Sequence, residues 1–214
     1  MKKSILLTVF LLSFTKLAFS QNVTIGVSGK PLQLSNKSTT EGNPYFNPAS
    51  TKSTLLTTSG KQIDLPAVKY NLYTQEVEYS DNNQIYAVQD SLKGFTILDS
   101  AGIKHNFVKM NAGKENLFFG VLATGKIELL KHYSAKKATT EDWYTKKQTK
   151  KIVPQSTYYY SKNGVIEKLN ISEKKLLPIF SGKESLVKTF ISEKSPDLKT
   201  EAGLVAVFDY YNTL

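Results

Sequence analysis

The sequence of 214 residues contains no cysteine, no arginine, only two histidines and only two methionines. Without cysteine the chain has no disulfide bonds, no thiol chemistry and no cysteine-ligated zinc. Because arginine is missing, all 28 basic residues are lysines, and the planar side chain that reads guanine edges and phosphates with two hydrogen bonds is absent. We therefore expect no nucleic-acid partner.

Long hydrophobic runs are also missing, except at the N-terminus. There, Met1-Lys2-Lys3 precedes an apolar run over residues 5–14, and Ala18-Phe19-Ser20 places small residues three and one positions before a cleavage site. The run is shorter than the roughly 20 residues that cross a bilayer. The pattern predicts a secretory signal peptide over residues 1–20, and hence export to the periplasm or cell surface without a transmembrane span. An uncleaved anchor or a buried strand is the alternative.

The chain that cleavage would leave remains basic. Residues 21–214 carry 25 lysines against 18 acidic residues, a formal charge of +7. Lysine is a hydrated point charge, so this excess suits solubility or attraction to an anionic surface.

Between residues 54 and 170 apolar and polar residues alternate with a period of two, as in Val68, Tyr70 and Leu72. This period is typical of strands with one hydrated face. Turn sequences such as Asp81-Asn82-Asn83 and Asn163-Gly164 separate the runs. Such short turns leave no room for crossover helices, so the sequence predicts an antiparallel meander, arranged as a sandwich or an open barrel.

Both flanks of this region differ from it. Residues 21–53 are poor in large apolar side chains and predict an irregular lead-in, within which Tyr45 and Phe46 either plug the core or form a ligand shelf. Residues 171–214 change to the helical period, with capping expected at Ser172 and Ser181 and a last helix from about Glu201. The predicted protein is thus mainly β with a small C-terminal helical cap.

Few residues point to catalysis. His105 and His132 lie in predicted strands without the spacing of metal ligands, and we expect the pairs Glu76 and Glu78 and Glu141-Asp142 to be solvated. No nucleophile elbow, phosphate-binding loop or dinucleotide fingerprint occurs. We therefore expect no enzyme activity, no metal and no cofactor; the alternative is a hydrolase with two carboxylates across a cleft.

The most unusual stretch is residues 131–151, which carries seven lysines around Trp143 and Tyr144. It predicts either a long hairpin kept soluble by its lysines or a basic arm with an aromatic tip. Tyr158-Tyr159-Tyr160 follows, and strand alternation should expose at least one of these rings. The candidate binding residues are Lys136, Lys137, Trp143, Tyr144, Lys146, Lys147, Tyr158, Tyr159 and Tyr160.

These features favour a non-catalytic exported protein that binds another component of the cell envelope: an envelope protein, an anionic lipid headgroup or a polysaccharide. A carbohydrate-binding module that uses exposed aromatic side chains is the alternative. The sequence makes no prediction of the oligomeric state.

Several short motifs stand out along the chain: Phe19-Ser20-Gln21, Pro44-Tyr45-Phe46-Asn47, Val68-Lys69-Tyr70-Asn71-Leu72-Tyr73, Leu122 to Lys131 and Tyr210-Tyr211-Asn212. Together they resemble a group of uncharacterised exported proteins of Bacteroidota. The resemblance implies an envelope location and a β-rich fold, and it supplies no catalytic residues.

Overall fold

A computed structural model of the chain describes residues 26–32 and 40–214. The expected signal peptide and residues 21–25 and 33–39 lie outside the described residues. The strands are β1 (Gly29–Pro31), β2 (Thr40–Glu41), β3 (Thr51–Thr57), β4 (Gln62–Asn71), β5 (Glu76–Asp81), β6 (Gln84–Val88), β7 (Leu92–Leu98), β8 (Lys104–Asn111), β9 (Asn116–Ala123), β10 (Ile127–Glu141), β11 (Gln148–Lys162) and β12 (Val165–Lys168). The helices are α1 (Glu173–Leu176), a 3-10 turn η1 (Leu177–Phe180), α2 (Glu184–Lys194) and α3 (Glu201–Thr213).

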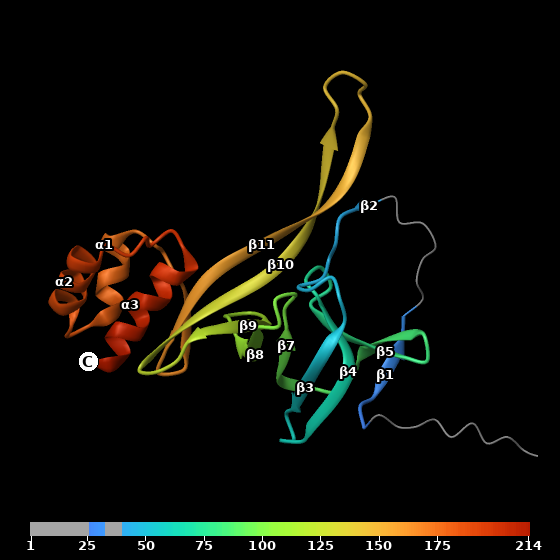
Figure 1. Ribbon diagram of the computed structural model, residues 1–214, viewed down its shortest axis with the longest axis horizontal. Coiled ribbons are helices and arrows are strands. Elements are labelled where there is room, and N and C mark those ends of the chain that lie inside the picture. Colours follow the sequence, from blue (N-terminus) through green and yellow to red (C-terminus); the bar gives the residue numbers. More distant parts are fainter. Residues whose placement is uncertain (1–25, 33–39) are drawn as a thin grey trace, which may run out of the picture.

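The strands form one open, mostly antiparallel sheet in the order β1-β6-β5-β4-β3-β7-β8-β9-β10-β11-β12. Strand β2 lies off this path and pairs in parallel with β11. The prediction of a mainly β, antiparallel protein with a helical C-terminus is confirmed (Figure 1). The path departs from a simple meander at its first two strands, where β1 pairs with β6 and β2 with β11, and again where β7 returns to pair with β3 and not with its predecessor β6.

This return forces the sheet to curl. Val88 ends β6 and Leu92 begins β7, so the chain takes four residue steps, or at most about 14 Å, between them. In a flat sheet the two strands would lie four strand spacings apart, or about 19 Å. The strands from β3 to β9 therefore wrap around a common interior.

Aromatic side chains fill that interior. Tyr70, Phe95, Phe107 and Phe118 come from four strands and are all buried. Phe95 and Phe107 stack with ring centroids 4.7 Å apart, and Tyr70 meets the edge of both rings. The alternation read from the sequence is confirmed here, because Val68, Tyr70 and Leu72 all belong to this buried core.

The lead-in is more ordered than predicted. Its described part contributes β1 and β2, and β3 begins inside it at Thr51. Phe46 packs edge-on against Phe107 and Tyr133, with ring centroids 5.2 and 5.0 Å apart. The interpretation of this segment as a plug for the core is therefore confirmed for Phe46.

A second core joins the helices to the sheet. Leu176, Phe180, Val187, Leu204 and Phe208 of the helical segment are buried together with Ala123, Ile127, Leu129 and Leu169. Figure 1 shows α1, α2 and α3 gathered beside the start of β10 and the end of β11. The helices therefore cover one end of the sheet, where β9, β10 and β11 would otherwise expose an apolar face.

Of the two predicted helix caps, the position of the first is confirmed and the second is wrong. Ser172 is the N-cap residue of α1, although its side chain makes no capping hydrogen bond. Lys183 occupies the N-cap position of α2, and Ser181 instead accepts a hydrogen bond from the Lys162 Nζ at 2.5 Å. Helix α3 does begin at Glu201, with the Thr200 hydroxyl accepting from the Gly203 amide at 3.1 Å.

Candidate functional site

The longest strands build a hairpin that extends beyond the rest of the molecule. Strands β10 and β11 pair without interruption from Ile127–Lys162 to Glu141–Gln148. Strand β9 pairs with β10 only at residues 129–131, and β12 pairs with β11 only at residues 159–162. We call residues 136–154 the arm, and residues 127–135 with 155–162 the base. The arm projects away from the helices and from the curled sheet (Figure 1).

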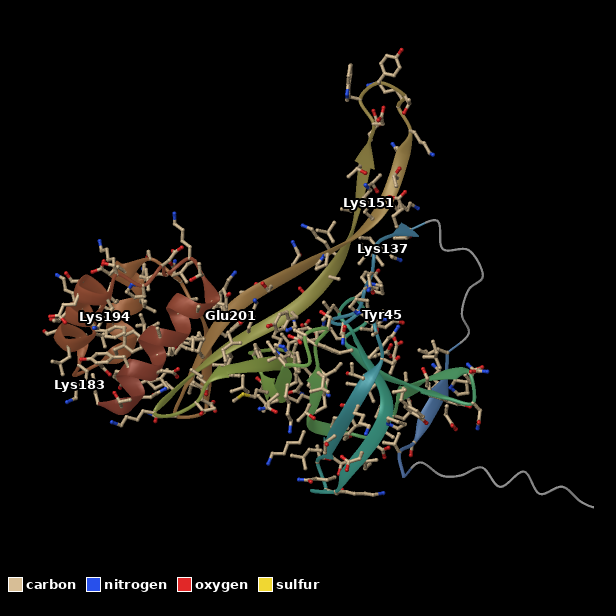
Figure 2. All side chains as sticks on the ribbon, in the orientation of Figure 1. Tyr45, Lys137, Lys151, Lys183, Lys194 and Glu201 are labelled. Atoms are coloured by element: carbon tan, nitrogen blue, oxygen red, sulfur yellow. The ribbon has the colours of Figure 1, made fainter. Side chains whose placement is uncertain are left out.

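A few contacts hold the start of the arm. The Ala135 amide donates to the Leu72 carbonyl at 2.9 Å, and the Lys137 ammonium lies 4.8 Å from the centre of the Tyr73 ring. Strand β2 pairs with Lys150 and Lys151 on the other edge. In Figure 2, Lys137 and Lys151 mark this region, far from the helix residues Lys183 and Lys194. No residue of the arm is buried.

The turn at the tip is held by Asp142. Its carboxylate accepts from the Thr145 amide at 2.6 Å, from the Thr145 hydroxyl at 2.9 Å and from the Tyr144 amide at 3.0 Å. The bonds from Thr145 keep the pKa of Asp142 below its ordinary value. Lys146 adopts a positive φ of 57°, which closes the turn. The tip is thus an ordered turn that presents the side chains of residues 143 and 144 in a defined way.

Those two side chains are the most exposed large apolar groups of the described residues. Trp143 is 83% exposed and Tyr144 is 80% exposed. Their ring centroids lie 5.7 Å apart at an angle of 67°, so the rings contact each other edge to face. They form a compact aromatic tip and not one flat platform.

Six lysines lie along the arm and in its turn. The strand register divides the four that lie on the strands between the two faces of the ribbon. Residues directly opposite each other in a strand pair share a face. Lys137 and Lys150 therefore lie on one face, while Lys136 and Lys151 lie on the other. Lys146 and Lys147 belong to the turn. With Glu141 and Asp142 as the only acidic residues, the arm carries a formal charge of +4.

Two of these lysines have weak ionic partners. Lys146 lies 3.6 Å from Glu141, and Lys151 lies 3.6 Å from Glu41 of β2. All four side chains are largely exposed, so solvent screens both pairs and each contributes little to stability. The positive charge of the arm is therefore accessible to a partner.

The three predicted tyrosines lie in the base and not in the arm. Tyr159 packs against the Phe119 ring at 5.1 Å, the Lys131 ammonium lies 5.2 Å from the Tyr158 ring, and the Tyr160 hydroxyl donates to Glu167. Burial and the bond to Glu167 raise the pKa of Tyr160 to about 12. All three are only half-exposed, so the structure does not present the open aromatic surface that the triplet suggested.

The structure thus places six of the nine predicted site residues on the arm and the other three in the base. From Gln148 to Tyr158 the strand rises about 33 Å, at about 3.3 Å per residue, so the tip and the tyrosine triplet cannot contact one small ligand. Strand alternation alone could not show that the tyrosines are covered. Phe119 packs on one face of β11 and the helical segment packs on the other, and neither contact can be read from the period of the strand.

Both histidines have structural partners. His105 Nε2 lies 2.9 Å from Asp99 Oδ2, and the edge of its ring packs against Phe46. The hydrogen bonds from His105 and from the Ile103 amide hold the pKa of Asp99 below its ordinary value. His132 Nδ1 lies 3.1 Å from the Phe118 carbonyl oxygen. Within residues 26–32 and 40–214, no three histidines or acids lie close enough to hold a metal ion.

One predicted solvated carboxylate is instead buried. Glu78 is only 3% exposed; it accepts from the Tyr45 hydroxyl at 2.9 Å and from the Asn71 side chain at 2.8 Å. The prediction for Glu78 was wrong because Tyr45, from the lead-in, covers this face of β5. Burial and the hydrogen bond to Glu78 raise the pKa of Tyr45 to about 12.

A second polar junction could not be seen in the sequence. Lys131 of β10 donates to Glu201 of α3 at 2.7 Å, and its ammonium also lies 4.9 Å from the Tyr133 ring. Burial alone would lower the pKa of Lys131, but the bond to Glu201 and the neighbouring charges leave it above its ordinary value. The two residues are 70 positions apart, so only tertiary structure pairs them.

Two hollows of about 490 and 510 Å³ lie over β3, β4, β7 and β8. Asp64 is the one carboxylate that lines the first, and Glu128 the one that lines the second. Neither of these two hollows has a second carboxylate, whereas a smaller hollow of about 240 Å³ is lined by both Glu76 and Asp90. The hydrolase alternative, which needs two facing carboxylates, therefore stays a prediction.

No protein family, no curated protein and no solved structure matches the chain. The resemblance to exported proteins of Bacteroidota therefore stays a prediction. Among the helices that the structure describes, none is long and apolar enough to cross a membrane.

Proposed function

We propose that this chain is a non-catalytic exported protein that binds another component of the cell envelope through the arm. One observation carries the proposal: the two most exposed large apolar side chains, Trp143 and Tyr144, sit together at the end of a lysine-bearing ribbon that projects from the body (Figure 1). Exposed aromatic side chains gathered at one point are typical of interaction sites.

The arm adds little to the stability of the fold, which supports a role in binding. An isolated two-stranded ribbon is marginally stable in water, and the arm buries no side chain in either core. Its ordered turn and continuous register nevertheless hold Trp143 and Tyr144 in place. An ordered backbone with exposed side chains is expected where those side chains bind a partner, because less conformational entropy is then lost on binding.

The charge of the arm suits an anionic partner. Its +4 charge would speed encounter with an acidic surface and oppose contact with basic ones. This attraction reaches about 10 Å at moderate salt, which is shorter than the arm. The partner must therefore approach the arm itself and not the body.

Pull-down from solubilised envelopes tests the proposal. The arm variant changes Lys136, Lys137, Lys146, Lys147, Lys150 and Lys151 to glutamine. The matched control changes six exposed lysines of the helical segment to glutamine: Lys174, Lys175, Lys183, Lys188, Lys194 and Lys199. We expect the arm variant to lose its partners and the control, which has the same net charge, to keep them. Equal capture by both variants would remove the arm from the proposal.

A carbohydrate-binding module remains the second candidate, because the exposed Trp143 ring could stack on a sugar. On a glycan array, that function predicts binding that Trp143→Ala abolishes. Retention of glycan binding by Trp143→Ala, or no binding by the unaltered protein, would dismiss this candidate.

A further inference from the structure

The shape of the charged surface on the arm narrows the class of partner. Lys137 and Lys150 lie on one face of the ribbon, Lys136 and Lys151 lie on the other, and the aromatic pair occupies the end. A folded protein that bound one face would leave the lysines of the other face unused. A surface that is entered end-on contacts the tip and brings both faces near its charge at once.

The chemistry of the tip agrees with entry into a lipid headgroup layer. Tryptophan and tyrosine combine an apolar ring with a polar group and concentrate at membrane–water interfaces. Lys146 and Lys147 follow Tyr144 within three residues, so the tip itself carries positive charge where it would meet anionic headgroups. Lys150 and Lys151, on opposite faces of the ribbon and two and three residues beyond Gln148, can add attraction without entering the layer.

The backbone limits how deep the tip can go. Beyond Ala135, the outer edge of β10 has no neighbouring strand within the described residues, and β11 has only the two-residue β2 beside this part of the ribbon. Unpaired backbone groups are strongly disfavoured in hydrocarbon. An open ribbon can therefore enter the hydrated headgroup layer but not the hydrocarbon core.

We infer that the tip of the arm docks end-on into the headgroup layer of an anionic lipid bilayer, with Trp143 and Tyr144 as the anchors and the arm lysines as the electrostatic attraction. This inference rests on the proposed function and specifies its partner. The lysines on both strands of the arm also make strand addition by a partner peptide less favourable, since charged side chains on an open edge strand oppose it.

The chain contains a natural probe for this contact. Trp143 is the only tryptophan, so its fluorescence reports on the tip alone. The protein, from Gln21 onward, is mixed with vesicles of phosphatidylethanolamine and phosphatidylglycerol, or with vesicles of phosphatidylcholine. We expect flotation with the anionic vesicles and a blue shift of the emission. Quenching should be stronger by lipids brominated near the headgroup than by lipids brominated at the chain end.

Two pairs of variants assign the binding to the tip. Trp143→Ser with Tyr144→Ser should abolish flotation, whereas Ile103→Ser with Leu186→Ser, which also removes two exposed apolar side chains from the body, should not. Lys146→Gln with Lys147→Gln should weaken vesicle binding by about tenfold or more at low salt, and Lys188→Gln with Lys194→Gln should leave it unchanged. Added salt should weaken binding by the unaltered protein.

The outcomes separate this inference from the proposed function. Absence of vesicle binding, flotation without a shift in Trp143 emission, or flotation retained by the tip variant would each overturn the lipid contact. If vesicles are not bound but the arm lysines are still needed for pull-down of an envelope protein or polysaccharide, the proposed function stands and only its lipid partner is wrong. If neither assay depends on the arm, both proposals fail.

Discussion

The base and the arm belong to the same hairpin, with one continuous register of fifteen pairs and no break at their boundary. They differ in what surrounds them. In the base, Ile127, Leu129 and Leu130 are fully buried. In the arm no side chain is buried, and the largest apolar groups point into solvent. Backbone pairing can therefore extend a strand pair past the core that supports it, and the extension is free to serve binding.

This difference also predicts how stability is distributed along the hairpin. Residues of the base take part in the cores that unfold with the whole molecule, while the arm relies on pairing between two exposed strands. We therefore expect amide exchange to quicken from the base toward residue 142.

The largest expected effect is a loss of stability from truncating a buried side chain of the base. Leu129 of the base is 0% exposed, so Leu129→Ala should lower the free energy of unfolding by about 2–5 kcal/mol. The matched change in the arm, Val153→Ala, removes a side chain that is 37% exposed and should cost less than about 0.5 kcal/mol. Urea unfolding measures both. Similar losses for the two variants would show that the arm also supports the core.

A smaller loss of stability is expected when the ion pairs of the base and of the arm are removed. Lys131 is 16% exposed and Glu201 40%, whereas Lys146 and Glu141 are 74% and 47% exposed. Lys131→Met keeps most of the apolar stem but loses the bond to α3, and should cost about 1 kcal/mol after allowance for solvent at Glu201. Lys146→Met should change the midpoint of urea unfolding very little. Equal shifts of the two midpoints would contradict the assignment of Lys131 to a structural junction.

The smallest effect concerns the pH dependence of the base. Burial raises the pKa of Tyr133 to about 12, above the value of about 10 expected in the unfolded chain. The folded state thus holds this proton more tightly, so the associated stability is full below pH of about 10 and is lost as the pH rises toward about 12. Tyr133→Phe cannot ionise and should lose less stability than the unaltered protein over that range.

Urea unfolding at successive alkaline pH values measures this difference. The pKa values of Tyr45 and Tyr160 are also raised, to about 12, and both residues ionise in both proteins. The variant should therefore still be destabilised at high pH, with a shallower slope. Parallel slopes for the variant and the unaltered protein would show that Tyr133 is solvated and that the base is less enclosed than its contacts indicate.

Much of the fold could be predicted from local patterns. The turns at Asn82-Asn83 and Asn163-Gly164 were predicted from residue types that tolerate positive φ, and all four residues adopt it. The period change near residue 171 located the helical segment, and the last helix was expected from about Glu201, where α3 begins. The lysine-rich hairpin was visible because its composition differs from that of the strands around it.

The errors have a common cause in contacts between distant residues. Glu78 was expected in solvent, but Tyr45 lies over it; Tyr159 was a candidate for an open surface, but Phe119 packs on it. The expected cap at Ser181 failed because α2 begins only at Glu184, with Lys183 at the N-cap, and the Ser181 hydroxyl is left to accept from Lys162, nineteen residues away. In each case the covering group lies outside the local window in which a periodic pattern can be read.

By itself the sequence determined which segments are extended, where the chain turns, the excess of lysine and the aromatic residues of the tip, because these properties depend on residue type and local spacing. Only the tertiary structure decided that the sheet curls back from β6 to β7, that the tyrosine triplet is partly covered and that Trp143 and Tyr144 are left in solvent. The physical reason is that alternation assigns side chains to two faces of a strand, while the elements that pack on each face determine which of them is covered.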